Sequence, residues 1–183
     1  MLSQPTLIVV SGPPGSGKTT LAHEIATVVG CPAICRDEIK EGMAHATPGF
    51  TPGQGDELTI RTLPAFFGVI ELLLKAGVTT VAEAAFQDRA WQPRLTPLLP
   101  LARIRIVHCA VDPEEAVGRI LRRRSANPVR GAHADPDPAD AADYLRQLHE
   151  FDRVALDVPS IEVDTTSGHR PGLREIVALI NGS

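Results

Sequence analysis

The sequence lacks several features that would assign it to particular classes of protein. No apolar run approaches the roughly 20 residues of a membrane-spanning helix, and residues 1–5 lack the basic patch and apolar stretch of a signal peptide. Cysteine is scarce, and neither the three cysteines nor the six histidines show a metal-binding spacing. We therefore expect a cytoplasmic protein without a membrane partner, whose Cys35 and Cys109 are reduced thiols in buried strands.

An excess of basic residues is also lacking. The chain has 18 Lys and Arg against 22 Asp and Glu, a net charge of −4. Proteins that grip long nucleic acids usually carry a basic surface, so a nucleic-acid partner is disfavoured. Aromatic residues make up only 4%, so a nucleotide base would have to stack on Arg, Pro or aliphatic groups. The length of 183 residues and the 43% hydrophobic content fit one globular domain.

A glycine-rich loop near the N-terminus is the most informative feature that the sequence does contain. Residues 12–19 fit G-x-x-x-x-G-K-[ST], follow the apolar stretch 7–10 and precede a helical pattern. The glycines let successive backbone N–H groups face one anion, and the helix start adds its positive dipole end. The residues expected to bind ATP are Gly12, Pro13, Pro14, Gly15, Ser16, Gly17, Lys18, Thr19 and Thr20. Lys18 would contact the β- and γ-phosphates, and the Thr19 hydroxyl would ligate Mg²⁺.

Segments with strand character alternate with helical patterns along the whole chain. The expected strands are 6–10, 33–35, 78–82, 104–109 and 160–163. The expected helices are 18–29, one capped by Asp37, 56–76, one starting near Gln92, 112–124, 137–156 and one starting at Pro171. This alternation predicts one α/β domain over residues 1–183, a three-layer α-β-α sandwich around a five-stranded parallel sheet.

Ligands bind such sheets at the carboxyl ends of the strands, which selects two acidic residues. Asp37 follows the second expected strand and could accept the proton of an attacking hydroxyl near the γ-phosphate, or it could only cap its helix. Glu83 follows the third expected strand, where an acidic side chain commonly reaches Mg²⁺. The alternative for Glu83 is a strand-end acid satisfied by a backbone amide.

Arginines flank and enter a Pro- and Gly-rich segment after the expected helix 112–124. They are Arg119, Arg122, Arg123, Arg124 and Arg130. Arg119 and Arg123 share one helix face and could neutralise phosphate charge, with Arg123 in a catalytic role. The alternative is a solvated helix face. We expect residues 122–136 to act as a lid that ATP orders.

Together these segments resemble the small P-loop kinases, of the AAA type, that are grouped with phage-type polynucleotide kinase, chloramphenicol phosphotransferase and zeta-toxin-like enzymes. The resemblance spans nearly the whole chain and rests on 12–19, 36–40, 81–86 and the arginine-rich segment. It implies the P-loop NTPase, nucleoside-kinase-like fold. Residues 164–166, Asp-Thr-Thr, resemble the Asp-Thr-Ser of shikimate- and gluconate-kinase relatives.

The resemblance also implies roles for single residues. In phage-type polynucleotide kinase the motif that matches residues 36–40 is Arg-Asp-x-x-Arg, whose Asp activates the acceptor hydroxyl and whose second Arg holds substrate phosphate. This implies Asp37 as the general base, with Lys40 in the place of the phosphate-binding Arg. Arg89 lies near a position where relatives carry an arginine that contacts substrate or phosphate.

The sequence therefore predicts an ATP- and Mg²⁺-dependent kinase that phosphorylates a hydroxyl of a small molecule. A polynucleotide 5′-hydroxyl kinase and a nucleotide-hydrolysing switch or binding protein are the alternatives. An N-K-x-D sequence is absent, which disfavours a GTPase. The acceptor pocket is expected between the loop after the second strand, the loop 47–55 and the long helix that carries Phe66 and Phe67.

Overall fold

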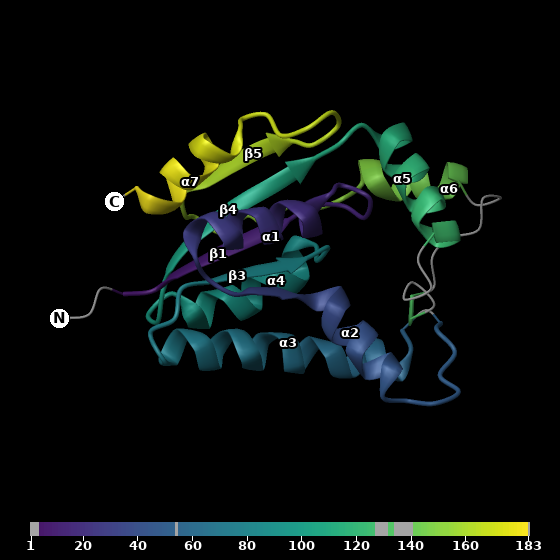
Figure 1. The fold of residues 1–183 in the computed structure, drawn as a ribbon, viewed down its shortest axis with the longest axis horizontal. Coiled ribbons are helices and arrows are strands. Elements are labelled where there is room, and N and C mark those ends of the chain that lie inside the picture. Colours follow the sequence, from purple (N-terminus) through teal and green to yellow (C-terminus); the bar gives the residue numbers. More distant parts are fainter. Residues whose placement is uncertain (1–3, 54, 127–131, 134–140, 183) are drawn as a thin grey trace.

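The protein is built around a parallel β-sheet whose first strand lies at its centre. The computed structural model describes residues 4–53, 55–126, 132–133 and 141–182. The sheet has five strands in the order β2-β3-β1-β4-β5, and every pair of neighbours is parallel. The strands are β1 (Thr6–Ser11), β2 (Ala33–Cys35), β3 (Thr80–Ala84), β4 (Arg103–Ala110) and β5 (Ser160–Asp164). Helices cover both faces of the sheet (Figure 1), which confirms the predicted three-layer α/β fold.

The helices divide between the two faces and the carboxyl end of the sheet (Figure 1). One face carries α1 (Lys18–Val29) and α7 (Leu173–Asn181), and the other carries α3 (Glu57–Lys75) and α4 (Asp88–Leu95), which the 3₁₀ helix η1 (Thr96–Leu98) extends. The remaining helices, α2 (Arg36–His45), α5 (Pro113–Ala126) and α6 (Ala141–His149), lie toward the carboxyl end. None of these helices, within the described residues, has the length and apolar character that crossing a membrane requires.

Alternation along β1 explains the two separate cores. Leu7 and Val9 point to α3 and α4, whereas Ile8 and Val10 point to α1 and α7. All six residues of β1 are buried, because both faces of a central parallel strand are covered by helices. The glycine-rich loop therefore follows directly after a strand that is packed on both faces.

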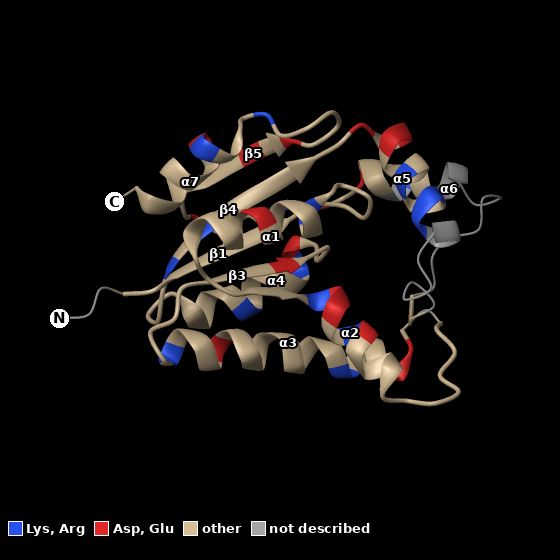
Figure 2. Ribbon diagram, viewed as in Figure 1, with Lys and Arg blue, Asp and Glu red and all other residues tan. Residues whose placement is uncertain are grey.

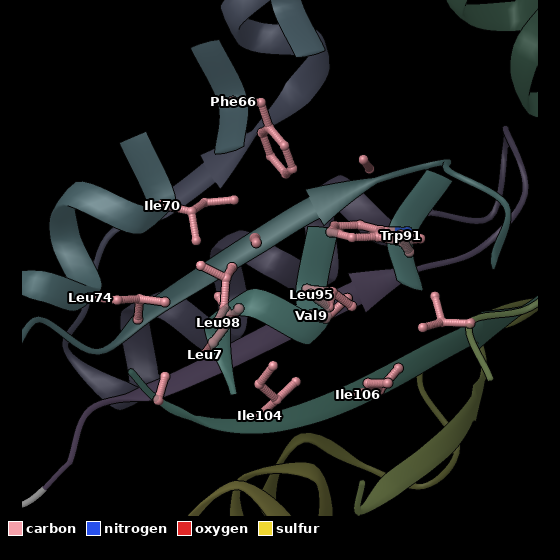
Figure 3. Packing of buried hydrophobic residues seen from close by; sticks show 14 residues of the cluster. Leu7, Val9, Phe66, Ile70, Leu74, Trp91, Leu95, Leu98, Ile104 and Ile106 are labelled. Carbon is pink, nitrogen blue, oxygen red and sulfur yellow. The ribbon is translucent and has the colours of Figure 1, made fainter. Parts of the chain in front are cut away.

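Four of the aromatic residues belong to one of the two cores, where Figure 3 shows Phe66 and Trp91. Phe66, Phe67, Phe86 and Trp91 form a group of ring contacts with centroids 5.1–6.1 Å apart. The indole Nε1 of Trp91 donates a hydrogen bond of 3.2 Å to the hydroxyl of Ser11, so its polar atom is satisfied inside the core. Phe66 is fully buried in this cluster, which makes it a packing residue rather than part of an acceptor pocket.

Three predicted element starts were wrong by two residues or more. The last helix, expected from Pro171, starts at Leu173, and the other two starts have local reasons. The strand expected at 78–82 is β3, two residues later, because Gly77 and Val78 still donate to carbonyls of α3. Glu83 consequently lies inside β3 rather than after it. The helix expected near Gln92 starts at Asp88, because the Gln87 carbonyl already accepts from the amides of Ala90 and Trp91.

The sixth helix is shorter than the sequence predicted. We expected it over 137–156, whereas α6 ends at His149. The chain beyond it, at 151–156, is not helical and is bonded to the start of α4: the Ala155 amide donates to Asp88 Oδ1 at 2.7 Å. Val154 is buried against the core, so tertiary packing decides the conformation of this segment. Residues 137–140 of the expected helix lie outside the described residues.

Candidate nucleotide-binding site

The loop between β1 and α1 has the geometry of a phosphate-binding loop. It leaves the carboxyl end of β1 and enters α1 through Gly17, the N-cap, at a left-handed φ of 72°. The loop is tied to its surroundings at two of its carbonyls. The hydroxyl of Thr165 donates to the Ser16 carbonyl at 2.6 Å, and Arg119 Nη1 donates to the Gly15 carbonyl at 3.4 Å. The positive end of α1 and the loop amides therefore form a preorganised anion site.

Gly15 is a position in this loop where both the backbone conformation and a close approach disfavour a side chain. Its φ is 78°, and an added Cβ would lie 2.6 Å from the backbone oxygen of Ala116. Gly49 has the same φ of 78° with nothing within 4 Å of an added Cβ. The two glycines therefore share the conformational requirement, and only Gly15 has the close approach.

Gly15→Ala is expected to weaken ATP binding at least about tenfold, equivalent to about 1.4 kcal/mol. The left-handed conformation costs a non-glycine residue about 1–2 kcal/mol, and the clash with α5 must in addition displace the loop. Gly49→Ala is the matched control: it should lower the melting temperature through the same conformational cost but keep the affinity for ATP. Equal affinity of the two variants in titration calorimetry would show that the approach of Gly15 to α5 does not shape the site.

A buried carboxylate connects the loop lysine to the loop threonine. Lys18 Nζ lies 3.5 Å from Glu83 Oε1, and the Thr19 hydroxyl donates to Glu83 Oε2 at 3.1 Å. Lys18 and Glu83 are 7% and 2% exposed. Burial raises the pKa of Glu83, and the nearby charge of Asp37 raises it further, although Lys18 and the Thr19 hydroxyl oppose this. A hydroxyl beside a carboxylate is a hard-oxygen donor set of the kind that Mg²⁺ prefers.

The Ser16 hydroxyl gives a second, independent indication that the loop binds a phosphate. The hydroxyl oxygen of Ser16 is buried, and it has no hydrogen-bond partner among the described residues. A buried hydroxyl without a partner costs free energy, and phosphate oxygens are strong acceptors for it. The residues present are therefore compatible with both a nucleotide phosphate and its metal ion.

Asp37 lies in the first turn of α2, beside this group of charges. The N-cap of α2 is Cys35 and no side chain caps the helix, so the prediction that Asp37 is the cap was wrong. Arg36 Nη1 donates to Asp37 Oδ1 at 2.9 Å. Burial would raise the pKa of Asp37, but Lys18, His133 and Arg36 together outweigh it and hold the pKa below its ordinary value. Asp37 is therefore an ionised carboxylate at neutral pH within the field of the loop lysine.

His133 lies in the sequence near a loop at the site end, where it could touch an acceptor, but the sequence favours a surface histidine without a role and assigns it none. Its imidazole Nε2 lies 3.0 Å from Glu41 Oε1 on α2, and its side chain is only 9% exposed. It is one of the groups that lower the pKa of Asp37. Residues 132–133 are thus packed against the helix that carries Asp37, a contact that no short sequence pattern could have indicated.

Lys40 makes a buried ion pair next to the loop 47–55. Its Nζ lies 2.8 Å from Asp56 Oδ2, and the two side chains are 4% and 10% exposed. Asp56 is also the N-cap of α3, where it accepts from the amide of Thr59 at 2.7 Å. Lys40 also lies 5.8 Å from the ring centroid of Phe50. Its charge is thus engaged inside the protein, and its role in acceptor binding stays a prediction.

Lys40→Ala is expected to lower the free energy of unfolding by about 3 kcal/mol, because it leaves the Asp56 carboxylate without its buried partner. The melting temperature should fall by roughly 6–12 °C. Lys75→Ala is the control: it breaks an exposed pair with Glu71 on α3 and should cost less than about 1 kcal/mol. Similar melting temperatures for the two variants would contradict the buried-pair assignment and favour a role for Lys40 at the surface.

Arg119 is the arginine of α5 that the structure brings to the loop. Its Nη2 donates to the carbonyls of Thr165 and Thr166 at 2.8 Å each, and its Nε donates to Glu115 at 3.0 Å. It thereby connects α5, the loop after β5 and the phosphate-binding loop. Arg123 is partly exposed one turn further along α5, where basic residues follow an acidic first turn (Figure 2). Of the expected lid at 122–136, residues 127–131 and 134–136 lie outside the described residues.

The remaining predicted residue, Arg89, is exposed in the first turn of α4. A pocket of about 230 Å³ lies nearer the loop, bounded partly by Gly12, Pro13, His108 and Arg153. His108 lies in β4 near its carboxyl end, which is the signal that could have selected it. Arg153 follows α6 and pairs with Glu162 of β5, and only the tertiary fold brings it there.

A glycine-rich loop of this form, at the carboxyl end of the central strand of a parallel sheet, defines a P-loop nucleotide-binding domain. The chain belongs to the AAA domain family, whose model matches residues 7–154. No curated protein sequence matches the chain.

Solved structures share the fold at low sequence identity. A protein of Chloroflexus aurantiacus with a provisional kinase assignment has a TM-score of 0.81 and 24% identity, and 96% of each chain is covered. The APS kinase of Mycobacterium tuberculosis, in complex with AMPPNP and APS, has a TM-score of 0.64 and 14% identity over 97% of this chain and 98% of that one. The shikimate kinase of Acinetobacter baumannii, in complex with shikimate, has a TM-score of 0.60 and 17% identity over 98% and 94%. These likenesses confirm the predicted fold, which is that of small P-loop kinases.

Proposed function

We propose that this protein is an ATP-dependent kinase that transfers the γ-phosphate to a hydroxyl group of a small molecule. The observation that carries the proposal is the convergence of Lys18, Thr19, Glu83 and Asp37 from three neighbouring strand ends. Each carboxylate is within electrostatic range of Lys18 and of the other carboxylate. A nucleotide switch needs only the phosphate site. Phosphoryl transfer to a hydroxyl also needs a base that takes the hydroxyl proton, and an ionised Asp37 beside the phosphate site can supply it.

In the proposed reaction, Lys18 and the loop amides hold the β- and γ-phosphates of ATP. Asp37 accepts the proton of the acceptor hydroxyl as its oxygen attacks the γ-phosphorus, and the bond from that phosphorus to the β–γ bridging oxygen breaks to release ADP. Thr19 and Glu83 would hold Mg²⁺, which neutralises phosphate charge when bound. Arg119 and Arg123 are proposed to bind the nucleotide. Arg123 would lie near the negative charge that develops on the phosphate groups during transfer.

Several proteins that share the fold are small-molecule kinases by name, among them shikimate kinase and APS kinase, which supports a small acceptor. A chain of an RNA repair complex shares the fold as well. The net charge of −4 and the internal pairing of Lys40 disfavour a polynucleotide. The acceptor is proposed to lie between Asp37, the loop 47–55 and the pocket beside Gly12.

The release of ADP from Mg²⁺–ATP tests the proposal. The rate is measured without acceptor and then with gluconate, shikimate, adenosine phosphosulfate and an oligonucleotide that carries a 5′-hydroxyl. A small-molecule kinase should turn over about 10² times faster or more with its acceptor. Stimulation by the oligonucleotide alone would indicate the polynucleotide kinase, and a rate that no hydroxyl compound changes would indicate a switch.

A further inference from the structure

A cluster of metal-ligating side chains lies beside the P-loop, on the side of β2 that faces α1. It consists of His23 on α1, Cys35 at the end of β2 and Glu38 in the first turn of α2. His23 Nε2 lies 2.7 Å from Glu38 Oε1 and 3.7 Å from Cys35 Sγ. One ligand atom from each residue lies within 4.8 Å of the other two. The three residues come from three elements, so no sequence spacing reveals them.

The distances suit a tetrahedral ion. With Zn–S, Zn–N and Zn–O bonds of about 2.0–2.3 Å, ligand atoms around zinc are roughly 3.3–3.7 Å apart. The distance between Cys35 and His23 already meets this value. The ligand atoms of Cys35 and Glu38 lie within 4.8 Å of each other. The contact between His23 and Glu38 must open by less than about 1 Å on this bond-length argument. Both side chains are free to make that change, because they are 50% and 48% exposed.

The three side chains differ in exposure, which would let an ion enter from solvent and bind to a fixed, buried ligand. Cys35 is 2% exposed and forms the floor of the cluster, whereas His23 and Glu38 form its rim. An ion held by the three side chains would keep a fourth position open to water. The thiol sulfur distinguishes this cluster from the Thr19–Glu83 pair, because soft ligands select zinc-like ions and hard oxygens select Mg²⁺.

We propose that His23, Cys35 and Glu38 form a binding site for a thiophilic divalent cation of the Zn²⁺ type, adjacent to the Mg²⁺ position at the P-loop but built from other ligands. The Cys35 thiol also contacts the Glu83 carboxylate, and burial together with the charges of Glu83 and Glu38 raises the pKa of this thiol. The ion therefore has to displace the thiol proton to solvent, and the thiolate, the imidazole and the carboxylate become its ligands. The site needs neither ATP nor kinase activity, so its failure and the failure of the proposed function are distinguishable.

Titration of the reduced protein with Cd²⁺ tests the site, because a cadmium–thiolate bond absorbs in the ultraviolet. One equivalent of Cd²⁺ should produce this band in the wild-type protein, in a large excess of Mg²⁺ and without nucleotide. Cys31→Ser is the matched control, since Cys31 is a partly exposed free thiol outside the cluster, and this variant should keep the band. Cys35→Ser should lose it.

His23→Gln guards against a folding defect in the Cys35 variant, because His23 is half exposed and Gln fits its place. This variant should keep the wild-type melting temperature and bind Cd²⁺ at least about tenfold more weakly, a loss of about 1.4 kcal/mol. A band that survives in Cys35→Ser, disappears in Cys31→Ser or is absent from the wild-type protein would overturn the proposal. So would unchanged affinity in His23→Gln.

Discussion

Lys18→Ala is expected to reduce phosphoryl transfer at least about 10³-fold. The lysine supplies the mobile positive charge for the β- and γ-phosphates, and no other Lys is placed in the phosphate-binding loop. The measurement is kcat for ADP release with the best acceptor. Wild-type turnover in this variant would exclude the P-loop as the catalytic site.

The same substitution also has a structural cost that must be separated from the catalytic one. Lys18 is buried and pairs with Glu83, so its removal leaves a buried carboxylate without its cation. The double variant Lys18→Ala with Glu83→Gln removes that charge as well. We expect the melting temperature to fall in the single variant and to recover in the double variant, while both remain inactive. Recovery of activity together with stability would mean that the lysine acts only through folding.

Asp37→Asn is expected to lower kcat by about 10²–10⁴-fold while leaving the affinity for ATP unchanged. The amide has nearly the same size as the carboxylate and can still accept from Arg36, but it cannot take a proton. The substitution does not remove a helix cap, because α2 begins after Cys35. The loss should therefore appear in turnover rather than in stability.

Glu57→Gln on α3 is the control for this change. It makes the same replacement of a carboxylate by an amide at a side chain that is 82% exposed, and it should leave kcat as in the wild-type protein. ATP affinity is measured by calorimetry and kcat by ADP release. Equal kcat for the Asp37 and Glu57 variants would remove Asp37 from the role of base.

The parts of the fold that depend on local pattern could be predicted from the sequence. The run of apolar residues in β1, the glycine-rich loop and the apolar face of α1 lie together in the chain, and α1 begins and ends where expected. The strand β2 also has its expected bounds. Periodicity and turn chemistry act within a few residues, so they suffice for these elements.

The parts that depend on distant contacts could not be predicted. The sequence predicted a helix for the segment after α6, yet the hydrogen bond to Asp88 and the burial of Val154 hold this segment against the core in a non-helical conformation. The phosphate-binding role that the resemblance implies for Lys40 stays a prediction, but its ion pair with Asp56 could not be foreseen, because Asp56 lies beyond a loop that the sequence does not orient. The cluster of His23 and Cys35 likewise arises only when α1 packs on β2. In each case the deciding partner is remote in sequence.

The destination of the γ-phosphorus tests the central claim most directly. Phosphorus NMR follows Mg²⁺–ATP with the acceptor that stimulates ADP release, for the wild-type protein and for Asp37→Asn. We predict that the wild-type protein converts the γ-phosphate signal into the signal of a phosphomonoester of the acceptor, at the same rate as ADP forms. Asp37→Asn should make this product at least about 10²-fold more slowly. Appearance of the phosphorus only as inorganic phosphate, at the same rate in both proteins, would contradict the account.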